Sequence, residues 1–142
     1  MIDEILKLLG DCPQVHCEQS EDRVRVLPGN PEGFEVAIEQ IWDQHYTVSY
    51  AGWHEDFAVW EEALRCFLLG LSNHSRLKVK SRDGNPFKWT AEDWEDPAWV
   101  ERSTTASFSS KLFTPAVTAY LQNDLLPDGD LHRLLDKVVA HA

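Results

Sequence analysis

The sequence has no long hydrophobic run and few cysteines. No stretch of its 142 residues approaches the ~18 consecutive apolar residues of a membrane-spanning helix, so we expect none. Residues 1–9 carry acids where a secretion signal carries positive charge, and their apolar run is too short for such a signal. The chain has three cysteines, Cys12, Cys17 and Cys66. An odd number cannot all pair within the chain, which favours free thiols and a reducing cytoplasm.

Local catalytic and metal-binding motifs are also missing. The chain contains no Gly-x-Ser-x-Gly, Walker, Rossmann glycine or His-Glu-x-x-His pattern, and no EF-hand spacing. Cys12, His16 and Cys17 lie close in sequence, but no second close pair completes a zinc site, and Cys17 fits an inward position on a strand. We therefore expect no metal and no cofactor. Because catalytic residues can assemble from distant parts of a chain, an enzyme is not excluded.

Basic residues are scarce, since 13 lysines and arginines face 24 acids and the net charge is −11. Nucleic acids and anionic membranes are polyanions, so this excess argues against a general binder of either. It favours a protein partner with a basic surface, attracted over a distance that salt limits to ~8 Å at physiological strength. The oligomeric state is left open.

Segments of alternating character surround one strong helical stripe. Residues 23–27, 34–38 and 46–50 alternate apolar with polar side chains, as half-buried strands do, and their short connections favour an antiparallel meander. Glu55 and Asp56 then precede a predicted helix over residues 57–71, at the positive end of its dipole. The helix is indicated by apolar side chains at helical spacing: Phe57, Trp60, Leu64, Phe67, Leu68 and Leu71.

A second group of strands and a last helix follow. Asp83-Gly84 predicts a tight turn inside a hairpin over residues 77–90. Residues 113–122 fit either a helix or a strand, and apolar spacing predicts a helix over 131–139. We therefore predict a single α+β domain over residues 1–142, an antiparallel sheet with helices packed on one face. At the level of fold this order is similar to that of type III secretion chaperones.

Residues 52–90 contain a series of short motifs. On these motifs, given below, the segment resembles a group of small bacterial proteins that have no assigned activity. The resemblance implies a bacterial protein of one small domain and supplies no catalytic residues. The motifs are Gly52-Trp53-His54, Glu61-Glu62-Ala63-Leu64, Phe67, Gly70-Leu71-Ser72, Arg76-Leu77 and Lys88-Trp89-Thr90.

Positive charge gathers in one segment. Residues 76–88 hold five of the basic residues and one acid, a net charge of +4 against −15 for the rest of the chain. On a strand, Arg76, Lys78, Lys80 and Arg82 project from one face. Two interpretations stay open: lysines that discourage pairing at a sheet edge, which we favour, or a docking strip for an acidic partner or an anion. Pairing with the protein's own acids would weaken both.

The chain is rich in tryptophan, with six in total. Trp60 belongs to the helical stripe and is expected in the core. The others lie at predicted strand ends or turns, where aromatic side chains close a core or form a recognition patch. Trp94 and Trp99, beside an acidic turn predicted at residues 92–97, are the best candidates for exposed binding residues.

Three functional hypotheses follow, of which an anion or nucleic-acid site on residues 76–88 is the weakest because the surrounding charge is negative. We favour a non-enzymatic protein-binding module of the chaperone, adaptor or immunity type, because of the charge, the aromatic turns and the missing motifs. The alternative is a small-molecule binder or hydrolase-type enzyme with a pocket between sheet and helix. The candidate binding residues of the module are Trp94, Trp99, Arg76, Lys78, Lys80, Arg82, Trp53 and His54. The alternative pocket would be lined by Tyr46, Tyr50, Trp53, Trp89 and His54.

Overall fold

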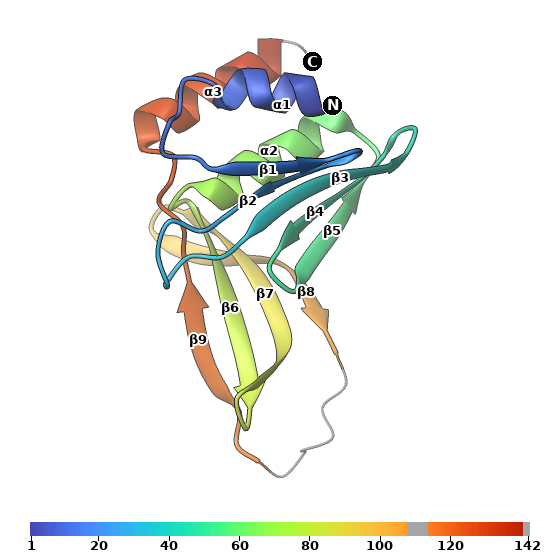
Figure 1. The fold of residues 1–142 in the computed structure, drawn as a ribbon. Helices are drawn as coiled ribbons and strands as arrows, with labels where there is room; N and C mark the ends of the chain where they lie inside the picture. Colours follow the sequence, from blue (N-terminus) through green and yellow to red (C-terminus); the bar gives the residue numbers. More distant parts are fainter. Residues whose placement is uncertain (108–113, 141–142) are drawn as a thin grey trace.

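The computed structural model describes residues 1–107 and 114–140 (Figure 1). Its helices are α1 (Ile2–Leu9), α2 (Trp60–Leu71) and α3 (Asp128–Ala140). The strands before α2 are β1 (Cys17–Ser20), β2 (Arg23–Val26), β3 (Val36–Trp42), β4 (His45–Tyr50) and β5 (Trp53–Phe57). The strands after α2 are β6 (Ser75–Arg82), β7 (Asn85–Glu95), β8 (Ala98–Ala106) and β9 (Val117–Leu121). None of the described helices is long and apolar enough to cross a membrane.

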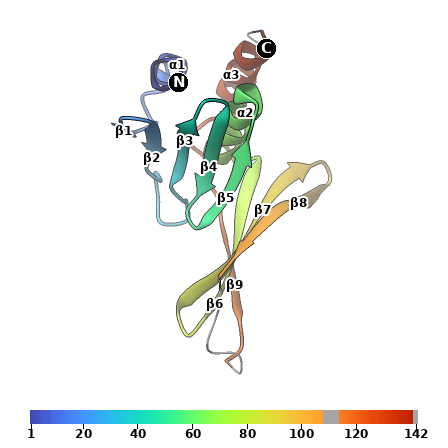
Figure 2. The same ribbon diagram turned by 90° about the vertical axis from the view of Figure 1, so that its right-hand side faces the viewer.

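The strands form two antiparallel sheets. The α+β class is confirmed, but the single sheet that we predicted is wrong. The first sheet is a meander in the order β1-β2-β3-β4-β5, and the second has the order β8-β7-β6-β9. Figures 1 and 2 show the second sheet extending away from the end of the first with a strong twist. The chain starts this second sheet only after α2, so β5 and β6 are not neighbours.

Helix α2 packs on both sheets. It contacts β3, β4 and β5 of the first sheet, β6 of the second, and α3. The ring of Tyr50 on β4 closes directly onto Gly70, where an added Cβ would lie 2.4 Å from the ring. The Tyr50 hydroxyl donates to the carbonyl of Cys66 (2.5 Å). The predicted stripe is buried at Leu64, Phe67, Leu68 and Leu71.

The helix begins later than we predicted. Phe57 ends β5, and Glu55 and Asp56 also lie on that strand, so the prediction of a helix from residue 57 is wrong. Asp56 pairs across the sheet with Thr47, whose hydroxyl donates to it (2.7 Å), and so does not serve a helix terminus. Phe57 falls at helical spacing from Trp60 and Leu64 only by coincidence. It lies on β5, where side chains alternate between the two faces of the sheet, and it is half-buried there.

The predicted hairpin is confirmed. β6 and β7 pair across Asp83-Gly84, whose φ values of 53° and 77° suit a tight hairpin turn. β7 continues to Glu95, so most of the turn predicted at residues 92–97 is strand. Within residues 113–122, the segment that fitted either structure, β9 is a strand on β6, while residue 113 lies outside the described residues. α3 includes the predicted helical residues 131–139.

Asn123 connects three parts of the chain. The residue lies in the segment that joins β9 to α3, and it is 1% exposed. The side-chain oxygen accepts from the backbone N–H of Phe34 (3.1 Å), and the amide nitrogen donates to the carbonyls of Phe34 (2.9 Å) and Gly70 (2.9 Å). These bonds hold the connection between β2 and β3, and the end of α2, against the segment that follows β9.

We expect Asn123→Ala to lower the free energy of unfolding by about 3 kcal/mol, because it leaves three buried backbone groups without a partner. Urea denaturation followed by tryptophan fluorescence measures the change. The control is Asp124→Ala at the exposed neighbouring position. Equal stabilities for the two variants would show that Asn123 does not connect these segments.

Candidate functional site

The predicted cationic row lies on one face of β6. Ser75, Leu77 and Val79 are buried and point inward, while the basic residues alternate with them on the outer face. In the described part of the chain, helix α2 packs on this sheet at β6. Strand β5 of the first sheet contacts β7 and β8. The row consists of Arg76, Lys78, Lys80 and Arg82, and Lys88 on β7 lies directly opposite Lys80.

One end of this face carries an arginine between aromatic rings. The Arg76 guanidinium lies over the rings of Trp99 (4.4 Å) and Tyr120 (4.1 Å) and donates to the buried Glu92 (2.6 Å). Trp94 packs edge-on against Trp99, with 5.5 Å between ring centroids. Trp94 is 40% and Tyr120 49% exposed, so the cluster presents aromatic surface to solvent around a neutralised charge.

The other end of the face keeps unbalanced positive charge. Lys78 lies 4.0 Å from Glu101, whereas no ion pair involves Lys80 or Lys88 among the described residues. Like charges directly opposite on neighbouring strands destabilise a sheet. The positive charge of this end is therefore available to a negatively charged group.

Protection of a sheet edge does not explain the row. We favoured that interpretation from the sequence, but β6 has β7 on one side and β9 on the other, so it is a central strand. The edge strand beside it is β9, which carries no charged residue. Lysines on a central strand cannot block pairing at an edge, and the interpretation is wrong.

The remaining two candidate binding residues lie elsewhere. Trp53 is fully buried and packs against Tyr50 with 4.5 Å between the centroids of the tilted rings, and its Nε1 donates to the hydroxyl and carbonyl oxygens of Ser103. His54 is exposed on β5, and its backbone N–H and carbonyl bond the hydroxyl of Thr105. The structure therefore places Trp53 in the core and His54 beside β8, away from the outer face of β6.

Arg102 joins the two sheets from the inside. A bulge in the pairing of β7 with β8 places it opposite no residue of β7. Its Nη1 donates to Asp93 (3.2 Å), and its guanidinium lies 5.0 Å from the ring of Trp53 and 5.3 Å from that of Tyr50. A cation over two buried rings stabilises the junction that holds the second sheet on the body.

The alternative pocket between sheet and helix is occupied by side chains at its centre. Tyr50 and Trp53, two of its predicted lining residues, are fully buried in the core against α2. Burial raises the pKa of the Cys66 thiol on α2 to about 11 and raises that of Tyr50 well above 10. Both groups therefore stay protonated at neutral pH, a poor state for a nucleophile or a base.

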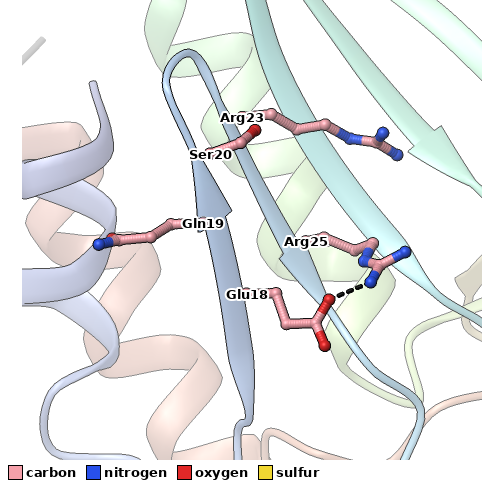
Figure 3. Close-up of a pocket in the computed structure, with 5 residues that line it drawn as sticks. All are labelled: Glu18, Gln19, Ser20, Arg23 and Arg25. Atoms are coloured by element: carbon pink, nitrogen blue, oxygen red, sulfur yellow. Dashed lines mark hydrogen bonds and ion pairs between the residues drawn. The ribbon is translucent and has the colours of Figure 1, made fainter.

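A shallow pocket of about 170 Å³ lies on the β1–β2 hairpin. Figure 3 shows Glu18, Arg23 and Arg25 on one side of the hairpin and Gln19 pointing to the other. Arg25 bonds Glu18, and both arginines lie 3.6 Å from Glu35, so their charges are balanced within the protein. This pocket offers a ligand little unpaired charge. Among the described residues, no group of three or more His, Cys, Asp or Glu could hold a metal ion.

Two members of the outer face were missed in the sequence. Tyr120 lies in the segment that fitted helix or strand, so its neighbours could not be assigned. Glu92 lies in a predicted turn, whereas the structure pairs it with Arg76 across β6 and β7. The alternating basic residues predicted the face itself. The rings over Arg76 follow from the strand order, which local patterns do not specify.

We expect Lys88→Glu to raise the free energy of unfolding by about 0.5 kcal/mol, because it replaces a repulsion with an attraction to Lys80. Denaturant titration at low salt measures the gain, which should shrink at high salt. Lys137→Glu on α3 makes the same change in net charge at an exposed site and should give no gain. A loss of stability in Lys88→Glu would mean that the facing lysines are already neutralised.

We expect Cys66 to resist alkylation by iodoacetamide at pH 8 in the folded protein, since a pKa of about 11 leaves roughly one thiolate in a thousand. Cys17, which is partly exposed, should react first. Mass spectrometry of peptides, with urea-unfolded protein as the control in which all three react, gives the order. Reaction of Cys66 as fast as Cys17 would contradict the closed core.

Comparison with known proteins finds no match among family models, curated proteins or solved structures.

Proposed function

We propose that the protein is a non-enzymatic protein-binding module, of the chaperone, adaptor or immunity type, and that it binds its partner on the outer face of the second sheet. We call this surface the docking face and define it as the side chains of Arg76, Lys78, Lys80, Lys88, Trp94, Trp99 and Tyr120. The proposal rests mainly on one observation: the facing lysines Lys80 and Lys88 lie on central strands and form no ion pair within the part of the chain that the structure describes.

The composition of the docking face suits protein recognition. Exposed tryptophan, tyrosine and arginine are the side chains that contribute most at protein interfaces, and here they form one cluster around Arg76. Arg76 is held in place by Glu92 and two rings, so little side-chain entropy is lost when a partner covers it. Lys80 and Lys88, which have no ion-pair partner among the residues described, would attract carboxylates of the partner.

The charge of the whole chain supports a different contact. With a net charge of −15 outside residues 76–88, the body would attract a partner with a basic surface, as the composition alone favours. We propose the docking face as the primary contact because two of its lysines, Lys80 and Lys88, form no ion pair with any described residue, whereas the arginines of the β1–β2 pocket are paired. The three free cysteines fit a reducing compartment, and we propose that binding takes place in the cytoplasm.

The test is capture of partners by the immobilised protein from a cell extract at low and high salt. The first variant carries Lys80→Glu and Lys88→Glu, and its control carries Lys7→Glu and Lys137→Glu, the same change in charge on exposed helix residues. The second variant is Trp99→Ala, with Trp42→Ala as its control, because Trp42 is 65% exposed and lies on the first sheet.

We expect a partner to be retained by the wild type and both controls and lost by both docking-face variants. High salt should weaken the capture, since the lysines act through charge. If the docking-face variants retain the partner and the Lys7 and Lys137 control loses it, the partner binds the acidic body outside residues 76–88. Retention by every variant would refute the docking face as the binding surface.

A further inference from the structure

In the described part of the chain, the docking face ends at an edge strand, β9. β9 pairs with β6 on one side and is the last strand of its sheet. Its sequence, Val-Thr-Ala-Tyr-Leu, contains no charge and no proline, and Val117 is 66% exposed. Natural sheets usually guard such edges with lysine, proline or a bulge. The edge of β9 has none of these, whereas the lysines lie one strand further in.

The free hydrogen-bonding groups of this edge can be assigned from the neighbouring bonds. The N–H of Trp94 donates to the carbonyl of His74 (2.8 Å), so even-numbered residues of β6 bond to β7 and the odd-numbered ones bond to β9. Leu121 pairs with the odd-numbered Leu77, so the backbone N–H and carbonyl of Leu121 point toward β6. The N–H of Gln122 donates the opposite way, to the carbonyl of Glu32 (2.8 Å). By alternation, the N–H and carbonyl groups of Thr118 and Tyr120 point out of the sheet.

The side chains beside this edge specify what an added strand would carry. A residue opposite Thr118 would project its side chain over the docking face. The added strand would lie two strand spacings, or about 10 Å, from β6. A glutamate at that position and Lys80 together are long enough to meet across this distance. Thr118 is short and leaves that path open. The next residue of the added strand would project to the other side, beside the exposed Val117. Acidic and apolar residues in alternation would satisfy both sides.

We infer that an extended peptide segment in which acidic and apolar residues alternate adds to β9 as a fifth strand of the second sheet. Its backbone would bond Thr118 and Tyr120, its acids would meet the charge of Lys80, and its apolar residues would cover Val117. This inference rests on the proposed function, because it names the partner's form and the edge by which it enters the docking face.

A second copy of this chain suits the edge poorly. Two β9 strands paired antiparallel would make one continuous sheet with both docking faces on the same side. That arrangement would bring two lysine-rich faces together between two bodies that are each strongly acidic. An acidic peptide removes the repulsion between the lysines, whereas a second copy adds to it.

The experiment is fluorescence polarisation with a labelled synthetic peptide in which valine alternates with glutamate. Thr118→Pro removes an outward N–H and no bond to β6, a position where sheets tolerate proline. Gln19→Pro is its matched control, because the backbone N–H of Gln19 also points outward from an edge strand, β1. The Leu27 N–H donates to the His16 carbonyl, so even-numbered residues of β1 bond to β2 and odd-numbered ones point away from it. Lys80→Glu tests the charge. Circular dichroism of each variant checks that it is folded.

The wild type should bind the peptide saturably, and Thr118→Pro and Lys80→Glu should each weaken binding by about tenfold or more, equivalent to 1.4 kcal/mol. Gln19→Pro should bind as the wild type does, and a peptide of alternating valine and lysine should not bind. Absence of saturable binding by the wild type refutes the inference. So does self-association in sedimentation that Thr118→Pro abolishes, since the occupant would then be a second copy.

Failure of the inference and failure of the proposed function give different results. If Lys80→Glu weakens binding of the peptide and Thr118→Pro does not, the peptide lies across the docking face without pairing to β9. The docking face then stands and strand addition is refuted. If neither change matters, both are refuted.

Discussion

One helix, α2, packs against both sheets, and this constraint shapes the rest of the molecule. α2 presents its apolar stripe to β3, β4 and β5, and its end to β6, so the residues around it have to fit closely. Gly70 admits the ring of Tyr50, and Asn123 satisfies the backbone at the same place. In the described chain α1 packs on β2 and α3 packs on α2, so neither makes extensive contact with the second sheet.

The exposed face that results is not an ordinary solvated surface. A face of β6 and β7 that only had to meet water could carry charges of both signs, as Glu18, Arg23, Arg25 and Glu35 do on the first hairpin and just before β3. On the outer face of the second sheet Glu92 pairs with Arg76 and Glu101 with Lys78, and over residues 1–107 and 114–140 no ion pair involves Lys80 or Lys88. We expect repulsion between Lys80 and Lys88 to cost the folded state stability. A cost of this kind at one place, on a protein otherwise rich in acids, is typical of a site shaped for binding.

The sequence predicted those features that depend on neighbouring residues. Alternation around Lys78 placed the basic row on one face, and Asp83-Gly84 located the hairpin turn. The error at Phe57 arose because one residue satisfied the helical period while its strand context went unrecognised. Strand order was beyond local patterns, since the pairing of β9 with β6 joins segments about 40 residues apart. For that reason the role of the lysines could be decided only when β6 was seen to be central.

Hydrogen–deuterium exchange of the protein with a captured partner bound tests the central claim most directly, because it locates the contact without any substitution. The account predicts slower exchange in β6, β7 and β9, with β1 to β4 unchanged. Slower exchange confined to the first sheet or to α1 and α3, with β6 and β9 unchanged, would contradict it.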